Sequence, residues 1–180
     1  KLVLGGIDIK DLTDKQMQKV RGKDVAMIFQ DALTALNPVM TVGRQIDEIF
    51  LAHGKEHFSD ETGKALSRFA RKKEAKRRTI EALKLVGISD AELRYKSYPH
   101  QLSGGMRQRV LIAMAFACNP HLIIADEPTT ALDVTIQAQV LDILKELQRK
   151  QKTSLMLITH DLSIVMNMAD KIYVMYCGKI

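Results

Sequence analysis

The chain has 180 residues, of which 46% are hydrophobic and 27% are charged, and its formal net charge is +6. These values are ordinary for a globular protein with one substantial core, with or without a small appendage. No apolar stretch approaches the roughly 20 residues that span a bilayer, and the first residues do not resemble a signal peptide. We therefore expect a cytosolic protein in which both cysteines, Cys118 and Cys177, are reduced.

Short apolar runs organise the sequence. Their apolarity is continuous rather than alternating, which is typical of strands buried on both faces in a parallel sheet. Segments with helical periodicity lie between them, and Val134 to Leu147 is the clearest. This alternation predicts an α/β fold. The four predicted strands are Val25–Phe29, Leu122–Ala125, Leu155–Ile158 and Ile172–Tyr176.

The stretch from Thr41 to Tyr98 contains no convincing strand, so we expect a mostly helical subdomain inserted into the sheet domain. Within it, Arg68 to Arg78 contains seven basic residues. A solvated helix face is the favoured explanation of such a run. The alternative is a surface for nucleic acid or an anionic membrane, but Phe69 is the only aromatic residue in the run and no nucleic-acid module is recognisable.

Polar residues follow three of the apolar runs. Gln30 follows the first, Asp126 and Glu127 follow the second, and Thr159 and His160 follow the third. In an open parallel sheet, ligands bind beyond the carboxyl ends of the strands. We therefore expect these side chains to converge on one site, although each alone could be an ordinary loop residue.

Asp126 and Glu127 form a carboxylate pair at the end of a predicted buried strand, as in the Walker B arrangement of nucleotide hydrolases. The first carboxylate can hold Mg²⁺ through its water shell, because this hard cation keeps several waters and takes few carboxylates. The second can orient and polarise an attacking water. The following segment, residues 128–133, strengthens this interpretation.

Ser103, Gly104 and Gly105 precede a predicted helix. Glycines at a helix start let the backbone approach a phosphate, and the exposed N–H groups and the helix dipole attract anions. For an isolated Ser-Gly-Gly, however, a simple N-cap followed by a turn is the better explanation.

Together these motifs resemble the nucleotide-binding subunits of ABC transporters across nearly the whole chain. Residues Asp31 to Pro38 and Tyr98 to Gln101, together with Met106, are similar to the dipeptide, oligopeptide and nickel importers within that family. The motifs occur in family order: Gln30 matches the Q-loop, Leu102–Met106 the signature, Leu122–Glu127 the Walker B strand, Ala131–Asp133 the D-loop and His160 the switch histidine.

The resemblance implies an α/β fold with the parallel-sheet core of a P-loop NTPase. Residues 1–40 and 99–180 would form a partial RecA-like ATPase core, and residues 41–98 the inserted helical, or signature, subdomain. The function implied is an ATPase subunit that couples ATP hydrolysis to uptake of peptides or a related small solute. An alternative is a non-transporter ABC-type ATPase acting on nucleic acid or the ribosome, but the expected long coiled coil or paired domains are missing.

The resemblance also assigns roles toward ATP and Mg²⁺. Glu127 would be the general base, His160 would contact the γ-phosphate, Gln30 would reach Mg²⁺ and report the nucleotide state, and Asp126 would hold Mg²⁺ through water. The residues assigned to nucleotide binding, partly across a subunit interface, are Ser103, Gly104, Gly105, Gln101 and Asp133.

The partners implied are a second ATP-binding subunit paired head to tail, transmembrane permease subunits and, indirectly, a solute-binding protein. Nucleic acid is not expected. The location implied is cytoplasmic and peripheral, on the inner face of the cell membrane.

The sequence departs from the family pattern in one respect. The phosphate loop G-x-x-x-x-G-K-[ST] is absent, because no Gly-Lys pair is followed by Ser or Thr. We therefore expect a fragment without the N-terminal strand and phosphate loop, and without ATPase activity on its own. The resemblance further predicts a three-stranded core with Leu122–Ala125 in the middle. Ile172–Tyr176 would then be displaced, closed onto the strand before it, or paired with another molecule.

Overall fold

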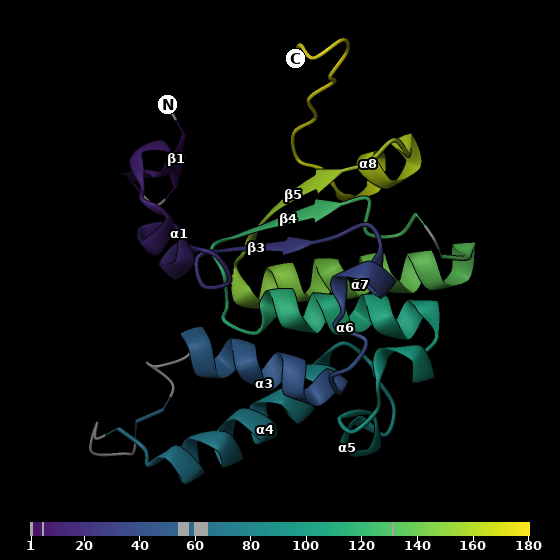
Figure 1. Ribbon diagram of the computed structural model, residues 1–180. Coiled ribbons are helices and arrows are strands. Elements are labelled where there is room, and N and C mark those ends of the chain that lie inside the picture. Colours follow the sequence, from purple (N-terminus) through teal and green to yellow (C-terminus); the bar gives the residue numbers. More distant parts are fainter. Residues whose placement is uncertain (1, 5, 54–57, 60–64, 131) are drawn as a thin grey trace.

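A three-stranded parallel sheet lies at the centre of the computed structural model (Figure 1). The structure describes residues 2–4, 6–53, 58–59, 65–130 and 132–180. The strands are β3 (Val25–Ile28), β4 (Leu122–Asp126) and β5 (Ser154–Ile158), and β4 lies between the other two. The predicted order of the first three apolar runs is confirmed.

Helices α6 (Gly104–Phe116) and α7 (Val134–Gln151) lie together along one face of the sheet (Figure 1). Helix α7 buries Val140, Leu144 and Leu147 at helical spacing, as its periodicity predicts. Because successive strand residues point to opposite faces, residues such as Ile28, Ile123 and Ala125 are fully buried while their neighbours are not. The short helix α8 (Leu162–Met168) follows β5.

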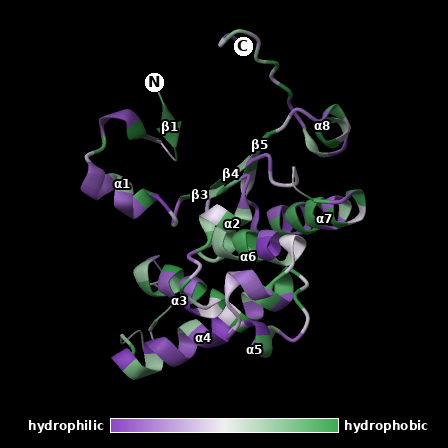
Figure 2. Ribbon diagram, turned by 45° about the vertical axis from the view of Figure 1, so that its right-hand side comes forward, coloured by the Kyte–Doolittle hydropathy of each residue, from purple (hydrophilic) through white to green (hydrophobic). Residues whose placement is uncertain are grey.

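The described residues between β3 and α6 form helices and an isolated antiparallel bridge between Ser59 and Ala65. The helices are α2 (Ala32–Ala35), α3 (Val42–His53), α4 (Arg68–Leu85), α5 (Ala91–Arg94) and the 3₁₀ turn η3 (Pro99–Gln101). Of the predicted helical subdomain, residues 54–57 and 60–64 lie outside the described residues. Figure 2 shows α4 as a largely hydrophilic helix on the far side of α3 from the sheet.

A half-buried carboxylate ties these helices together. Asp47 on α3 accepts hydrogen bonds from the Thr79 hydroxyl on α4 (2.6 Å) and from the Tyr95 hydroxyl (2.5 Å). The Tyr95 ring lies against Gly43, where a Cβ on the glycine would come within 2.1 Å of the ring. Burial raises the pKa of Asp47, although its two hydroxyl partners oppose that effect. Burial, and then Asp47, raise the pKa of Tyr95.

The N-terminal segment forms elements that the apolar runs do not predict. Strands β1 (Val3–Leu4) and β2 (Ile7–Asp8) make an antiparallel pair, followed by the 3₁₀ turn η1 (Ile9–Asp11) and α1 (Asp14–Val20). Two-residue strands are too short to leave a periodic signal in the sequence.

The prediction of a fourth strand at Ile172–Tyr176 is wrong. These residues are exposed, and their only pairing within the described chain is an isolated antiparallel bridge between Tyr176 and Lys179. The segment extends away from the sheet toward the C-terminus (Figure 1). Of the three arrangements expected for this segment, the structure shows displacement from the sheet. No helix in the described part of the chain is long and apolar enough to cross a membrane.

Candidate functional site

Glu127 lies at a sharp turn directly after β4. Its φ angle is 43°, in the left-handed region that residues other than glycine rarely adopt. Its N–H donates to the carbonyl of Ile158 at 2.9 Å, so the backbone remains bonded to the end of β5. Such strain concentrates at functional sites, because the surrounding structure must hold it in place.

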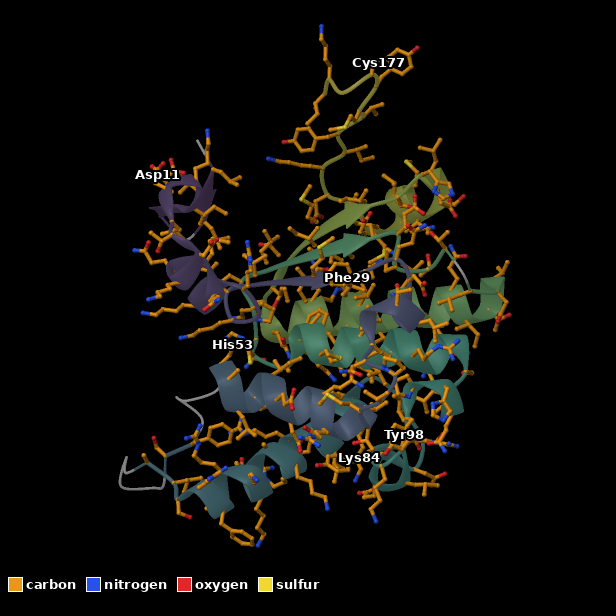
Figure 3. All side chains as sticks on the ribbon, in the orientation of Figure 1. Asp11, Phe29, His53, Lys84, Tyr98 and Cys177 are labelled. Carbon is orange, nitrogen blue, oxygen red and sulfur yellow. The ribbon has the colours of Figure 1, made fainter. Side chains whose placement is uncertain are left out.

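Three side chains donate hydrogen bonds to the Glu127 carboxylate. Gln30 Nε2 (2.9 Å) and Thr130 Oγ1 (2.8 Å) both contact Oε2, and His160 Nδ1 contacts Oε1 at 2.9 Å. Phe29, labelled in Figure 3, marks the end of β3 from which Gln30 follows. The carboxyl ends of all three strands therefore contribute to one cluster, as parallel topology requires.

These contacts keep Glu127 ionised. The hydrogen bond from His160, followed by that from Thr130, holds the pKa of the Glu127 carboxyl below its ordinary value. An ionised carboxylate only accepts hydrogen bonds, so the Nδ1 atom of His160 must carry the hydrogen in this contact. The His160 side chain is 75% exposed, whereas that of Glu127 is 25% exposed.

The residues assigned to Mg²⁺ have oxygen atoms free to bind it. Asp126 is partly buried at the end of β4, and none of the described residues hydrogen-bonds its carboxylate. Because Gln30 uses its Nε2 atom on Glu127, its carbonyl oxygen is left for another partner. Oxygen ligands of this kind are those that Mg²⁺ prefers. No group of three or more His, Cys, Asp or Glu residues suited to a metal occurs among the described residues.

Ser103 caps α6, and its hydroxyl accepts from the Met106 N–H at 3.3 Å. Ser103 and Gly104 are both exposed at the start of this 13-residue helix, where the backbone attracts anions. Gly105 serves packing as well, because a Cβ there would lie 2.5 Å from Cγ2 of Ile136 on α7. No hydrogen bond among the described residues joins this turn to the Glu127 cluster.

Gln101 and Asp133 have local roles in the structure. Gln101 Oε1 accepts from the Tyr98 N–H at 2.8 Å and closes η3, and Asp133 Oδ1 accepts from the Ile136 N–H at 2.9 Å and caps α7. Ala131, the first residue of the predicted D-loop, lies outside the described residues.

Sequence reasoning did not assign Thr130 to the site. Its hydroxyl reaches Glu127 only because the turn from 127 to 130 folds back, with the Thr130 N–H donating to the Glu127 carbonyl at 3.3 Å. A short polar segment after a strand does not specify such a turn, so nothing in the sequence distinguished Thr130 from Thr129.

Comparisons with known proteins support the resemblance to ABC transporter subunits. Residues 2–130 match the family described as ABC transporter. The chain is 52% identical over 179 residues to the oligopeptide transport ATP-binding protein OppD of Bacillus subtilis, covering 99% of this chain and 46% of that protein. It is 49% identical over 180 residues to the dipeptide transport ATP-binding protein DppD of Escherichia coli, covering 100% of this chain and 51% of that protein. The chain thus spans about half the length of these curated relatives.

Solved structures of ATP-binding cassettes share the fold. One is a dimeric cassette in a post-hydrolysis state bound to ADP and phosphate, with a TM-score of 0.70 and 30% identity over 89% of this chain and 62% of that one. The likeness identifies the sheet and its helices as an α/β fold of the P-loop NTPase kind. The family match covers the Q-loop, signature and Walker B residues, and the chain belongs to the ABC transporter family.

Proposed function

We propose that this chain is part of the ATP-binding and ATP-hydrolysing subunit of an importer that takes up peptides or a related small solute. The observation that carries the proposal is the Glu127 carboxylate, held at the carboxyl edge of the sheet by Gln30, Thr130 and His160. The names of the relatives, which are peptide transport ATP-binding proteins, support the solute class.

In this proposal Glu127 orients and polarises the attacking water. Oε2 already accepts from two donors, Gln30 and Thr130, whereas Oε1 accepts only from His160. A carboxylate oxygen accepts about two hydrogen bonds, so Oε1 retains a place for the hydrogen of a water molecule. The water would then sit beside the His160 ring, which would help to align it and contact the γ-phosphate.

Asp126 and the carbonyl oxygen of Gln30 would hold Mg²⁺, Asp126 through water. The cation would neutralise charge on the ATP phosphates when both are bound. Because Gln30 contacts Glu127 through one end of its amide and would contact the cation through the other, it would sense both groups. Gln30 would in this way report the nucleotide state to the rest of the transporter.

The turn of Ser103, Gly104 and Gly105 would bind the γ-phosphate of ATP held by a second ATP-binding subunit, paired head to tail. The exposed helix start supports this role, and a related cassette was solved as a dimer. Gln101 directly precedes the signature residues in sequence, Asp133 ends the D-loop, and both would contribute to the same interface.

The remaining partners in the proposal are transmembrane permease subunits and, indirectly, a solute-binding protein. The helical subdomain over residues 41–98 would carry the surface that meets the permease, and residues 1–40 and 99–180 would form the partial ATPase core. The protein would be cytoplasmic and peripheral, on the inner face of the cell membrane.

The test uses the whole protein that contains this chain. Glu127→Gln should lower Mg²⁺-dependent ATP turnover by about 10² to 10⁴-fold, because the amide cannot take up a proton, while nucleotide binding persists. The matched control is Glu146→Gln, an exposed α7 residue paired with Lys150. Turnover in Glu127→Gln equal to that of the control would refute the assignment.

A further inference from the structure

Helix α4 carries the net charge of the chain. It contains eight Lys and Arg residues and two Glu residues, so its own formal charge equals the +6 of the whole sequence. The helix buries only small or apolar side chains against its neighbours: Ala75, Thr79 and Leu83. The remaining faces present charge to the surroundings, and Figure 2 shows the helix as largely hydrophilic.

The charge is divided unevenly along the helix. Arg77 bonds to both glutamates of the helix, Glu74 and Glu81, and Arg78 bonds to Glu74 at 2.9 Å. Near the C-terminal end Lys84, labelled in Figure 3, pairs with Glu92 at 2.7 Å. The second half of α4 is therefore largely neutralised within the chain.

The first half has no such compensation within the described residues. Arg68, Lys72 and Lys73 are exposed, and none has an ion pair or hydrogen bond to another described residue. Lys76 lies over the Tyr95 ring, 5.3 Å from its centroid, a contact that leaves the charge intact. Phe69, at four residues from Lys73 and so on the same side of the helix, is 80% exposed.

We propose that the N-terminal half of α4 binds the anionic headgroup surface of a phospholipid bilayer, with Phe69 inserting at the level of the headgroups. Lysines and arginines that form no ion pair with another described residue, beside an exposed aromatic ring, are the combination that such a surface attracts. The helix lies at an extremity of the molecule, separated from the sheet by α3 (Figure 1), so the basic surface can approach a plane.

Charge and composition argue against two other partners, a permease loop and a nucleic acid. Cytoplasmic loops of membrane proteins carry an excess of Lys and Arg, so a permease loop would more often repel this basic surface than attract it. A nucleic-acid surface would call for aromatic residues interleaved with the basic ones, and Phe69 is alone in this half of the helix. The proposal rests on the proposed function only in placing the protein at a membrane.

The experiment measures binding of the whole protein to vesicles in the absence of ATP. The vesicles are phosphatidylcholine alone, or phosphatidylcholine with about a third phosphatidylglycerol. The test variant is Arg68→Gln/Lys72→Gln/Lys73→Gln, whose side chains are exposed and bond to no other described residue. The matched control removes the same charge from exposed residues elsewhere: Lys10→Gln/Lys15→Gln/Lys19→Gln.

We expect the wild type and the control variant to bind the anionic vesicles tightly and the neutral vesicles weakly. The test variant should bind the anionic vesicles at least about tenfold more weakly than the control. Phe69→Ser, which leaves the charge unchanged, should weaken binding by about tenfold through loss of the inserted ring. Each variant should hydrolyse ATP in solution at the wild-type rate.

Equal binding by the test and control variants would overturn the proposal, as would equal binding of the wild type to both kinds of vesicle. Tighter binding to single-stranded polyuridine than to anionic vesicles would also overturn it, and would assign the surface to nucleic acid. The ATP hydrolysis assay is separate, so a failed vesicle experiment with normal Glu127-dependent turnover rejects only this proposal. The expected vesicle binding without Glu127-dependent turnover rejects only the proposed function.

Discussion

Glu127 is the proposed base of this chain, and its neighbours hold its carboxylate in place. Its backbone adopts the left-handed conformation directly after β4. Donors from three segments then fix both carboxylate oxygens. Hydrogen bonds from neighbouring segments therefore hold the orientation of the Glu127 carboxylate.

The hydroxyl of Thr130 should influence the pH dependence of turnover. Its hydrogen bond helps to hold the pKa of Glu127 down, so Thr130→Val should raise that pKa. A base with a higher pKa is protonated at higher pH, so the acid limb of the kcat/KM profile of the whole protein should move to higher pH. Thr130→Ser, which keeps the hydroxyl, should retain the wild-type limb, and identical profiles for all three proteins would contradict the prediction.

At the scale of secondary-structure elements, two close approaches of helices depend on glycine. Gly105 on α6 faces Ile136 on α7, and Gly43 on α3 faces the Tyr95 ring. In both cases the missing Cβ is what allows the neighbouring element to pack where it does. The signature glycine therefore has a structural task inside its own chain in addition to its proposed contact with phosphate.

Gly105→Ala should lower the free energy of unfolding by about 1–3 kcal/mol, because the new Cβ overlaps the branched side chain of Ile136. Gly104→Ala is the matched control, since among the described residues its Cβ would meet only Leu132 Cδ2, at 3.8 Å, and alanine favours a helix. The measurement is urea unfolding, extended to a double-mutant cycle with Ile136→Ala. The loss should shrink in the Ile136→Ala background, and an unchanged loss would show that another contact causes it.

Asp47 should make the stability of the helical region depend on pH. Burial raises its pKa in the folded state, so its contribution to stability is fully present below the unfolded pKa and is lost as pH rises through the folded pKa. Asp47→Asn keeps a group that can bond to both Thr79 and Tyr95 but cannot ionise. As pH rises through the acidic range, we expect the urea concentration at the unfolding midpoint to fall less for this variant than for the wild type. Parallel pH curves for the two proteins would contradict this expectation.

The whole molecule shows how far sequence reasoning reaches. Continuous apolar runs predicted β3, β4 and β5 correctly, because burial on both faces of a strand leaves a signal in every residue. The same signal at Ile172–Tyr176 was misleading, since a strand forms only where a neighbouring strand can pair with it. The positions of Gln30, Glu127 and His160 after three predicted parallel strands indicated that they would meet. Thr130 and the strained backbone of Glu127 depend on turn geometry that no short pattern specifies.

One face of the sheet and the segment Ile172–Tyr176 expose apolar side chains. Helices α6 and α7 cover one face, whereas Met27 on β3 and Met156 on β5, which share a register through Ile124, are 41% and 53% exposed on the other. The residues from Ile172 to Tyr176 are also exposed and apolar. Both are surfaces that further polypeptide could bury.

Hydrogen exchange should therefore differ between the 180-residue chain and the whole protein. In the 180-residue chain, β4 is paired on both sides and its amides should exchange slowest, whereas those of Ile172–Tyr176 should exchange fast, because among the described residues only Tyr176 and Lys179 pair there. In the whole protein we expect Ile172–Tyr176 to become protected as a strand, since its apolar run suits a buried position. Mass spectrometry of peptic fragments can follow both segments. Slow exchange at Ile172–Tyr176 in the 180-residue chain would mean that this segment already pairs, either within the chain or with a second copy. Dilution would separate these two cases, because only pairing between copies depends on concentration.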